Sequence, residues 1–220
     1  MLKAVIFDMD GTLVDNMRFH DEAWFELLSA QGASFNRETF FSQTAGMKNP
    51  PILRMFLGND LSDEDCERLS QEKESHYRRL YRPNLAPIGG LEQLFADAAE
   101  AGIALGVATS APVENIDFVM DGLEIRHKFG AIVGAADIKN GKPAPDIYLK
   151  AAELLGAKPE ECLVVEDAPL GVESAFRAGC PCLVLTTSLT YPESMALPGV
   201  VAAATDLAAF PLSEMQKLFS

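Results

Sequence analysis

The chain has 220 residues, of which 48% are hydrophobic and 23% are charged, so it can bury a full core as one large domain or two small ones. Its net charge of −14 at pH 7 argues against a nucleic-acid or anionic-membrane partner, because both require basic surface, but it leaves room for a local positive site that binds a phosphorylated substrate. No run approaches about 18 apolar residues and the first residues lack a long apolar segment, so we expect neither a membrane span nor a signal peptide.

The first predicted element is a buried strand at residues 3–7, which form an apolar run with β-branched side chains. Asp8 and Asp10 follow it and, being two residues apart, point the same way in extended chain, while Gly11 lets the backbone turn. In open α/β sheets, ligands bind outside the carboxyl ends of the strands. At about 4 Å and an effective dielectric constant of about 20, the two carboxylates repel by roughly 4 kcal/mol. Such a pair needs a cation, a shared proton or a function.

A helical segment at residues 16–83 follows, with predicted helices at residues 18–31, 36–44, 50–57 and 63–82. The first is amphipathic, and Ser62 is the expected N-cap of the last. Prolines and glycines between residues 83 and 90 indicate a linker and turn at the end of the segment. An insertion directly after the strand that bears the aspartate pair would lie above this pair and could close over it to exclude water.

Strands and helices alternate in the remainder of the chain. Strands are predicted at residues 103–108, 131–134, 163–165 and 182–185, with an edge strand near residues 202–204. The helices between them are predicted at residues 91–101, 113–123, 146–155 and 169–178. This alternation indicates βαβ units and a parallel sheet. We therefore expect an α/β protein with a Rossmann-like core at residues 1–15 and 84–220 and a small all-helical cap domain at residues 16–83.

Polar residues follow several of the later strands: Thr109, Ser110, Lys142, Glu166 and Asp167. In a parallel sheet these strand ends share one rim with the aspartate pair, so four carboxylates meet one lysine and require added positive charge. Carboxylate and backbone oxygens are hard ligands that suit Mg²⁺, which often also binds substrate phosphate. A phosphoryl group above the metal could be held by Thr109, Lys142 and the backbone N–H groups at the start of the helix near Pro112.

These motifs, in this order, resemble those of the haloacid dehalogenase superfamily of phosphohydrolases. The resemblance covers essentially the full chain, and it rests on Asp8-Met-Asp10-Gly-Thr, on Thr109 after an apolar strand, on Lys142 within Gly-Lys-Pro-Ala-Pro-Asp, and on Glu166-Asp167. The position of the helical insertion resembles the subgroup that contains β-phosphoglucomutase and many small-metabolite phosphatases.

The resemblance implies a role for each of these residues. Asp8 is the nucleophile and forms an aspartyl-phosphate, while Asp10 protonates the leaving oxygen and then activates water. Thr109, Ser110 and Lys142 bind the phosphoryl oxygens. The implied ligands of Mg²⁺ are Asp8, the backbone carbonyl of Asp10, Glu166 and Asp167.

Simpler interpretations exist for some of these residues. The Asp8-x-Asp10-Gly sequence could be a fragment of an EF-hand, but Leu13 occupies loop position six and Phe19 occupies position twelve, where glycine and glutamate are required. Asp167 could simply cap the helix that begins near Pro169.

Two residues of the helical segment have an alternative structural role. His20 has helical spacing with Trp24 and could be a half-buried core residue, whereas the resemblance places a histidine here at the hinge between cap and core. Lys73, with Tyr77 one turn later, could reach the cleft between cap and core, but we expect a surface lysine. We expect three apolar residues to form the cap core rather than a substrate pocket: Met47, Met55 and Phe56.

The cap loop bears on which phosphoryl transfer occurs. Mutases of the resembling subgroup carry a lysine just before the position of Gly46 and an arginine three residues after it, where this chain has Ala45 and Asn49. That arginine clamps a second phosphate, and an amide is a poor substitute for a bidentate guanidinium. Lys48 could replace it only partly, and Asn16 replaces a mutase threonine. The candidate cap residues that contact substrate are Asn16, His20, Gly46, Lys48, Asn49 and Lys73.

We therefore expect an Mg²⁺-dependent phosphatase of a small phosphorylated metabolite such as a sugar phosphate. The main alternative is a mutase of the β-phosphoglucomutase type, and a pyrophosphatase is the third, because one site can serve any phosphoryl donor. An inactive metabolite-binding relative would be expected to lack the carboxylates that are present here. The four cysteines form no CxxC pair, so we expect reduced, buried thiols and a cytoplasmic location. We also expect a monomer.

Overall fold

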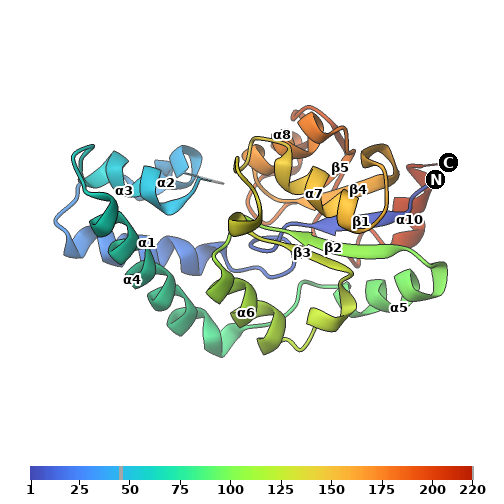
Figure 1. Ribbon diagram of the computed structural model, residues 1–220, viewed down its shortest axis with the longest axis horizontal. Coiled ribbons are helices and arrows are strands. Elements are labelled where there is room, and N and C mark those ends of the chain that lie inside the picture. Colours follow the sequence, from blue (N-terminus) through green and yellow to red (C-terminus); the bar gives the residue numbers. More distant parts are fainter. Residues whose placement is uncertain (45–46, 220) are drawn as a thin grey trace. The chain divides into compact units, whose positions relative to one another are not determined.

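The computed structural model describes residues 1–44 and 47–219, with only the backbone of residue 42 (Figure 1). The chain forms two compact units. One contains Met1–Asp15 and Ala86–Ser220, and the other contains Asn16–Leu85. No helix in the described part of the chain is long and apolar enough to cross a membrane.

The first unit is built on a six-stranded sheet in the order β3-β2-β1-β4-β5-β6. The strands are β1 Ala4–Phe7, β2 Ala104–Ala108, β3 Ala131–Val133, β4 Cys162–Glu166, β5 Cys182–Leu185 and β6 Val200–Ala204. Every neighbouring pair is parallel, which confirms the predicted α/β fold. The strand order reverses at β1, because β2 and β3 lie on one side of it and β4 to β6 on the other. A switch point of this kind opens a ligand-binding crevice at the carboxyl ends of β1 and β4.

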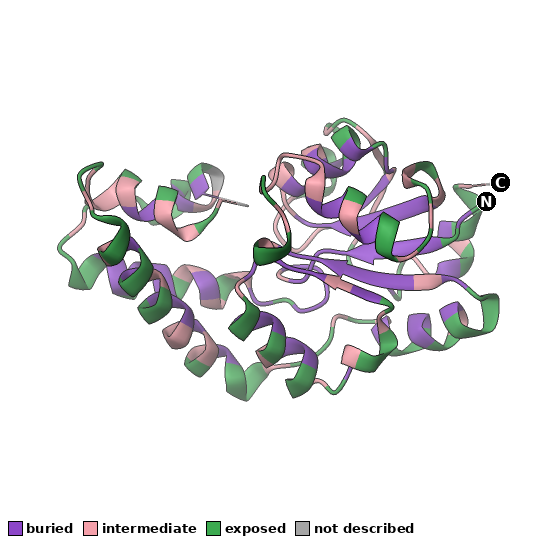
Figure 2. Ribbon diagram, in the orientation of Figure 1, coloured by how far each residue is buried: buried purple, intermediate pink, exposed green. Residues whose placement is uncertain are grey.

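Helices cover both faces of this sheet (Figure 1). They are α5 Leu91–Ala101, α6 Val113–Gly122, α7 Asp146–Leu154, α8 Pro169–Ala178, α9 Tyr191–Met195 and α10 Leu212–Lys217. Short 3₁₀ helices are η2 Arg126–Lys128, η3 Ala135–Asp137 and η4 Pro159–Glu161. The central strands are buried along their whole length (Figure 2), as the continuous apolar runs predict for strands covered on both faces.

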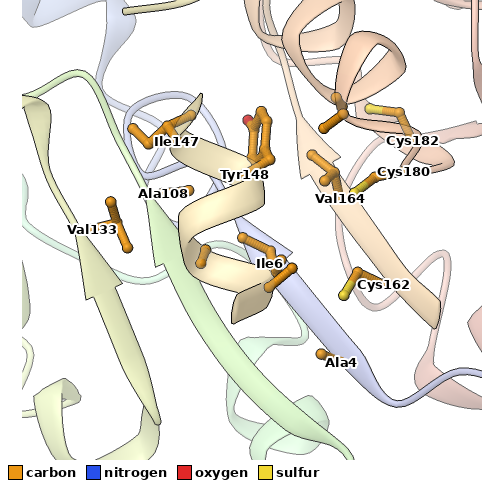
Figure 3. Packing of buried hydrophobic residues seen from close by; sticks show 14 of the residues in the cluster. Ala4, Ile6, Ala108, Val133, Ile147, Tyr148, Cys162, Val164, Cys180 and Cys182 are labelled. Atoms are coloured by element: carbon orange, nitrogen blue, oxygen red, sulfur yellow. The ribbon is translucent and has the colours of Figure 1, made fainter. Parts of the chain in front are cut away.

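The core on one face of the sheet lies between the strands and helices α7 and α8. Figure 3 shows Ile147 and Tyr148 of α7 beside Ile6 of β1 and Val164 of β4, all of them fully buried. The cysteines Cys162, Cys180 and Cys182 belong to the same cluster, and all four cysteines of the chain are free and buried, as expected.

The second unit contains α1 Met17–Ala30, α2 Arg37–Thr44, α3 Asn49–Leu57, α4 Asp63–Tyr81 and η1 Arg82–Asn84. Ser62 is the N-cap of α4, as predicted, since its hydroxyl accepts a hydrogen bond from the backbone N–H of Asp65 at 3.0 Å. An aromatic cluster around Trp24 and Phe40 forms its core, and Met47 and Phe56 pack against it, as expected. The expectation for Met55 is wrong, because this side chain is 50% exposed, outside the stripe that Ile52, Leu53 and Phe56 form on α3.

Candidate active site

Asp8 is the first residue after β1 and lies beside the end of β4. The register pairs Phe7 with Val165, and the backbone N–H of Asp8 donates to the carbonyl of Val165 at 2.9 Å. This pairing continues the parallel ladder by one residue and places Asp8 level with Glu166. The sheet itself therefore brings the two carboxylates together from positions that are distant in the sequence.

A cluster of three buried carboxylates forms at this point. Asp8, Glu166 and Asp167 each offer an oxygen within 4.8 Å of the others. The side chain of Asp10 is not part of this cluster among the described residues; Asp10 is partly buried and its backbone forms an isolated bridge with Val14. The structure thus brings together three of the four predicted acidic side chains.

Gly11 makes the close approach of Asp167 possible. It adopts a left-handed backbone conformation with φ of 73°, and a Cβ at this position would collide with the carboxylate of Asp167. Any other residue would be strained in this conformation and would displace the carboxylate. The glycine therefore serves both the turn and the packing of the site.

Lys142 is the cation of the cluster. Its Nζ lies 2.5 Å from Oδ1 of Asp8 and 2.7 Å from Oε1 of Glu166, and only 4% of its side chain is exposed. A buried ammonium is tolerated when charged partners surround it, as they do here. The two carboxylates hold Lys142 beside the predicted nucleophile.

Glu166 is fully hydrogen-bonded at both carboxylate oxygens. Oε1 accepts from Lys142 and from the hydroxyl of Tyr148 at 2.6 Å, and Oε2 accepts from the backbone N–H groups of Asp167 at 2.9 Å and Ala168 at 3.2 Å. A Cβ at Gly171 would collide with this carboxylate, so the glycine makes room for it. Sequence reasoning missed Tyr148. Its position six residues after Lys142, inside the predicted helix at 146–155, is the signal that could have found it.

The loop after β5 also contributes to the cluster, which sequence reasoning missed. The hydroxyl of Ser188 donates to Oδ2 of Asp167, and the hydroxyl of Thr187 donates to the carbonyl of Gly11 at 2.5 Å. The signal was present, because polar residues follow this strand as they follow β1, β2 and β4.

The alternative that Asp167 caps α8 is wrong: the N-cap is Ala168, and among the described residues no side chain caps this helix.

Thr109 lies directly after β2, on the same rim. Its backbone N–H donates to the carbonyl of Val133 at 3.0 Å, and its hydroxyl oxygen accepts from the N–H of Ala111 at 3.1 Å. The residue is 1% exposed, whereas Ser110 is partly exposed. A threonine hydroxyl that accepts one hydrogen bond can also donate its hydrogen to a ligand oxygen. Helix α6 begins a few residues later, with Pro112 as its N-cap.

Electrostatics indicate that the cluster lacks positive charge. Burial, together with the carboxylates of Glu166 and Asp10, raises the pKa of Asp8 to about 7 despite the opposing effect of Lys142. Burial and the same kind of repulsion raise the pKa of Asp167. Burial alone would lower the pKa of Lys142, but Asp8 and Glu166 outweigh it and raise this pKa. The cluster has more negative than positive charge and offers hard carboxylate oxygens, which suits a divalent cation such as Mg²⁺.

Several cap candidates form one polar network within the second unit. The Asn16 amide donates to the Tyr77 hydroxyl at 2.6 Å, and the His20 ring stacks on the Tyr77 ring with centroids 3.7 Å apart. The Nζ of Lys73 lies 2.7 Å from Nδ1 of His20 and 3.0 Å from Oε1 of Glu74. The expectation of a surface lysine is wrong: Lys73 is buried, because an adjacent carboxylate and aromatic rings compensate its charge.

The other cap candidates lie at the start of α3. The amide of Asn49 donates to Oε1 of Glu74 at 2.7 Å, so it joins the same network. Lys48 is the exposed N-cap residue of α3. Gly46 and its neighbour Ala45 lie outside the described residues.

Comparison with known proteins identifies the family. A family model for haloacid dehalogenase-like hydrolases matches residues 2–179, so the chain belongs to this family. The chain is 33% identical over 194 residues to hexitol phosphatase A of Escherichia coli, covering 87% of this chain and 86% of that protein. It is 29% identical over 176 residues to fructose-1-phosphate phosphatase of the same organism, and the match covers 80% of this chain and 92% of that protein. Its structure matches that of β-phosphoglucomutase of Clostridium difficile with a TM-score of 0.86 and 25% identity, and the match covers 99% of this chain and 96% of that one.

Proposed function

We propose that this haloacid dehalogenase-like hydrolase is an Mg²⁺-dependent phosphatase that acts on a small phosphorylated metabolite of the sugar-phosphate class. The observation that carries the proposal is the Asp8–Lys142 pair, buried within a carboxylate cluster at the switch point of a parallel sheet. An ammonium within hydrogen-bond distance of a carboxylate can offset part of the repulsion between this nucleophile and the phosphoryl group that it attacks.

The chemistry proceeds in two displacements. An oxygen of Asp8 attacks phosphorus, the bond to the leaving oxygen breaks, and Asp10 donates a proton to that oxygen. Water then attacks the aspartyl-phosphate, Asp10 takes its proton, and inorganic phosphate leaves with Asp8 restored. Two such steps each have a lower barrier than direct hydrolysis. Lys142 and the Thr109 hydroxyl hold the phosphoryl oxygens throughout.

The carboxylate cluster provides the metal site of this proposal. Asp8, the backbone carbonyl of Asp10 and Asp167 would hold Mg²⁺. When bound, Mg²⁺ supplies positive charge that offsets the repulsion between a carboxylate nucleophile and a phosphate dianion. The raised pKa values of Asp8 and Asp167 support this assignment, because both carboxyl groups lack sufficient counter-charge.

The substrate class rests on the relatives and on the cap. Two relatives are named as a fructose-1-phosphate phosphatase and a hexitol phosphatase. A mutase is the second candidate, and the structural match to β-phosphoglucomutase favours it. Against it, Asn49 stands where the resembling mutases carry a phosphate-binding arginine, and its amide hydrogen-bonds to the carboxylate of Glu74. A neutral amide, unlike a guanidinium, supplies no positive charge for a second phosphate.

Replacement of the nucleophile tests the mechanism. Asp8→Asn should lower Mg²⁺-dependent hydrolysis of p-nitrophenyl phosphate by several orders of magnitude, because a neutral amide cannot attack phosphorus. Asp97→Asn, the same change on α5 away from the cluster, is the matched control and should retain activity. Retained activity in a folded Asp8→Asn protein would refute the assignment of Asp8 as the nucleophile.

A trapped intermediate gives an independent test. Crystals of the wild-type protein soaked with Mg²⁺ and beryllium fluoride should show beryllium fluoride bonded to a carboxylate oxygen of Asp8. An adduct on another residue would contradict the assignment.

A screen of phosphorylated metabolites for phosphate release then identifies the substrate.

A further inference from the structure

Tyr148 contacts the Lys142–Glu166 pair in two ways. Its hydroxyl donates to Oε1 of Glu166 at 2.6 Å, the same oxygen that accepts from Lys142 at 2.7 Å. The ammonium of Lys142 also lies 5.1 Å from the centroid of its ring, within the range of a cation–π interaction. One side chain of α7 therefore contacts both members of the pair.

Packing alone does not account for the hydroxyl of Tyr148. The residue is fully buried on α7 within an apolar cluster that includes Ile6 and Val164 (Figure 3). A phenylalanine would fill almost the same volume without burying a polar group that must find a partner. The hydroxyl finds this partner in Glu166, so the hydrogen bond is its distinguishing contribution.

The contacts of Glu166 show what that hydrogen bond does. A carboxylate offers about four lone-pair positions. Here Lys142, Tyr148 and two backbone N–H groups supply four donors, two to each oxygen. An oxygen with both positions in use is poorly placed to bind a metal ion directly. The carboxylate of Asp167, in contrast, accepts from the Ser188 hydroxyl at Oδ2 and has further lone pairs to offer.

Lys142 in turn needs to be held. Its flexible four-carbon stem carries an ammonium with three donors, and Asp8 and Glu166 accept two of them. The third can point to a phosphoryl oxygen only while the first two fix the ammonium. The anchored Glu166 supplies that fixed point.

We propose that Tyr148 and Glu166 are positioning residues that hold Lys142 against Asp8, and that Glu166 anchors the lysine instead of binding the metal directly. The assignment of Glu166 differs from the one that the family resemblance implies. The inference rests on the proposed function only in that Lys142 acts on the transferred phosphoryl group.

Two carboxylate variants test the role of Glu166 without any turnover. Mg²⁺ binding is measured by calorimetry in the absence of substrate for Glu166→Gln and Asp167→Asn, which each remove one charge from the same cluster. We expect Asp167→Asn to weaken Mg²⁺ binding at least about 10-fold more than Glu166→Gln does. Equal or greater weakening in Glu166→Gln would overturn the assignment.

Tyr148→Phe tests the positioning role, because it keeps the ring and removes only the hydroxyl. We expect kcat with p-nitrophenyl phosphate to fall about 10-fold, as loss of a hydrogen bond to a charged group predicts, with Mg²⁺ affinity changed less than about twofold. Tyr191→Phe, on the surface of α9, is the matched control and should leave kcat unchanged. An unchanged kcat in Tyr148→Phe would refute the positioning role.

A double-mutant cycle separates positioning from general destabilisation. If Tyr148 acts through Glu166, the kcat of Tyr148→Phe combined with Glu166→Gln should be close to that of Glu166→Gln alone. Effects that multiply would show that the two residues act independently and would contradict the proposal. If the wild-type protein hydrolyses no phosphate ester, the proposed function fails, while the Mg²⁺ comparison still decides the role of Glu166.

Discussion

Gly11 shows how a residue without a side chain can determine the geometry of a site. Its left-handed conformation turns the chain after the aspartate pair, and the space beside it is occupied by the carboxylate of Asp167. Its carbonyl also accepts the hydroxyl of Thr187. The loop after β1, the end of β4 and the loop after β5 thus meet at one glycine.

Gly11→Ala should therefore weaken Mg²⁺ binding by more than 10-fold and also lower stability. The left-handed conformation costs an alanine about 1–2 kcal/mol, and the new Cβ must displace Asp167. Calorimetry of Mg²⁺ binding and thermal unfolding measure the two effects.

Gly32→Ala is a matched control, because Gly32 has the same φ of 73° but nothing within 4 Å of its Cβ position. It should show the loss of stability alone. Equal Mg²⁺ affinity in both variants would show that Gly11 does not maintain the position of Asp167.

At the scale of elements, the candidate site is a set of strand ends. The aspartate of β1, the threonine of β2, the acidic pair of β4 and the hydroxyl residues after β5 all lie on one rim, because the four strands are parallel neighbours. Lys142 comes from the loop before α7, and α7 also supplies Tyr148. Asp8, Thr109, Glu166 and Asp167 lie at or directly after the ends of strands, and Tyr148 lies on a helix, which favours a rigid arrangement of these groups, whereas Lys142 and Ser188 lie in loops.

The cap helices bear on the choice between phosphatase and mutase. The amide of Asn49 on α3 donates to Glu74 on α4, so an uncharged amide stands where the mutases of the resemblance hold an arginine. Incubation with β-glucose 1-phosphate and a bisphosphate primer should release inorganic phosphate rather than accumulate glucose 6-phosphate. Chromatography of the sugar phosphates and a phosphate assay follow the two products. Efficient isomerisation would reverse the order of the two candidates.

For the molecule as a whole, burial of unbalanced carboxylates reduces stability in the absence of metal. The pKa of Asp8 rises from 3.8 to about 7, with burial as the largest cause. A carboxyl group whose pKa is raised on folding binds its proton more tightly in the folded state. Its contribution to stability is therefore greatest at low pH and declines as pH rises through this interval.

With EDTA present, the Tm of the wild-type protein should fall relative to that of Asp8→Asn as pH increases from about 4 to about 7. Asparagine does not titrate, so the difference between the two proteins reports the titration of Asp8 together with the effect that its charge has on the neighbouring carboxylates. Thermal unfolding followed by circular dichroism at several pH values measures it. A difference that is constant with pH would contradict a raised pKa.

Mg²⁺ should reverse this effect. A ligand that binds only the folded state raises stability in proportion to the logarithm of its concentration above Kd. At pH 7 and above, added Mg²⁺ should raise the wild-type Tm by several degrees and that of Asp8→Asn by less. An equal rise in both proteins would show that the ion binds elsewhere.

Local patterns in the sequence were sufficient to predict the sheet and to select polar residues that the structure places at its rim. Apolar runs of strand length alternating with amphipathic helices indicated a parallel α/β sheet, and polar residues placed directly after those runs indicated one functional rim. These inferences hold because side-chain periodicity and strand direction are local properties that strongly limit the possible folds. Asp8 and Glu166 were identified in this way, and Lys142 was identified from the Gly-Lys-Pro-Ala-Pro-Asp segment that follows the strand at residues 131–134.

The contacts within the site were decided only by tertiary structure. The partners of Lys142 and Asp167, the hydrogen bond of Tyr148 and the burial of Lys73 depend on which strands and helices become neighbours and in what register. Lys142 and Asp8 lie 134 positions apart in the sequence, and no local pattern states that their atoms meet at 2.5 Å. The aspartates at the end of β1 were visible from the sequence alone. Their separation into one buried carboxylate within a charged cluster and one outside it required the folded sheet, because only packing determines which charges lose water and which partners replace it.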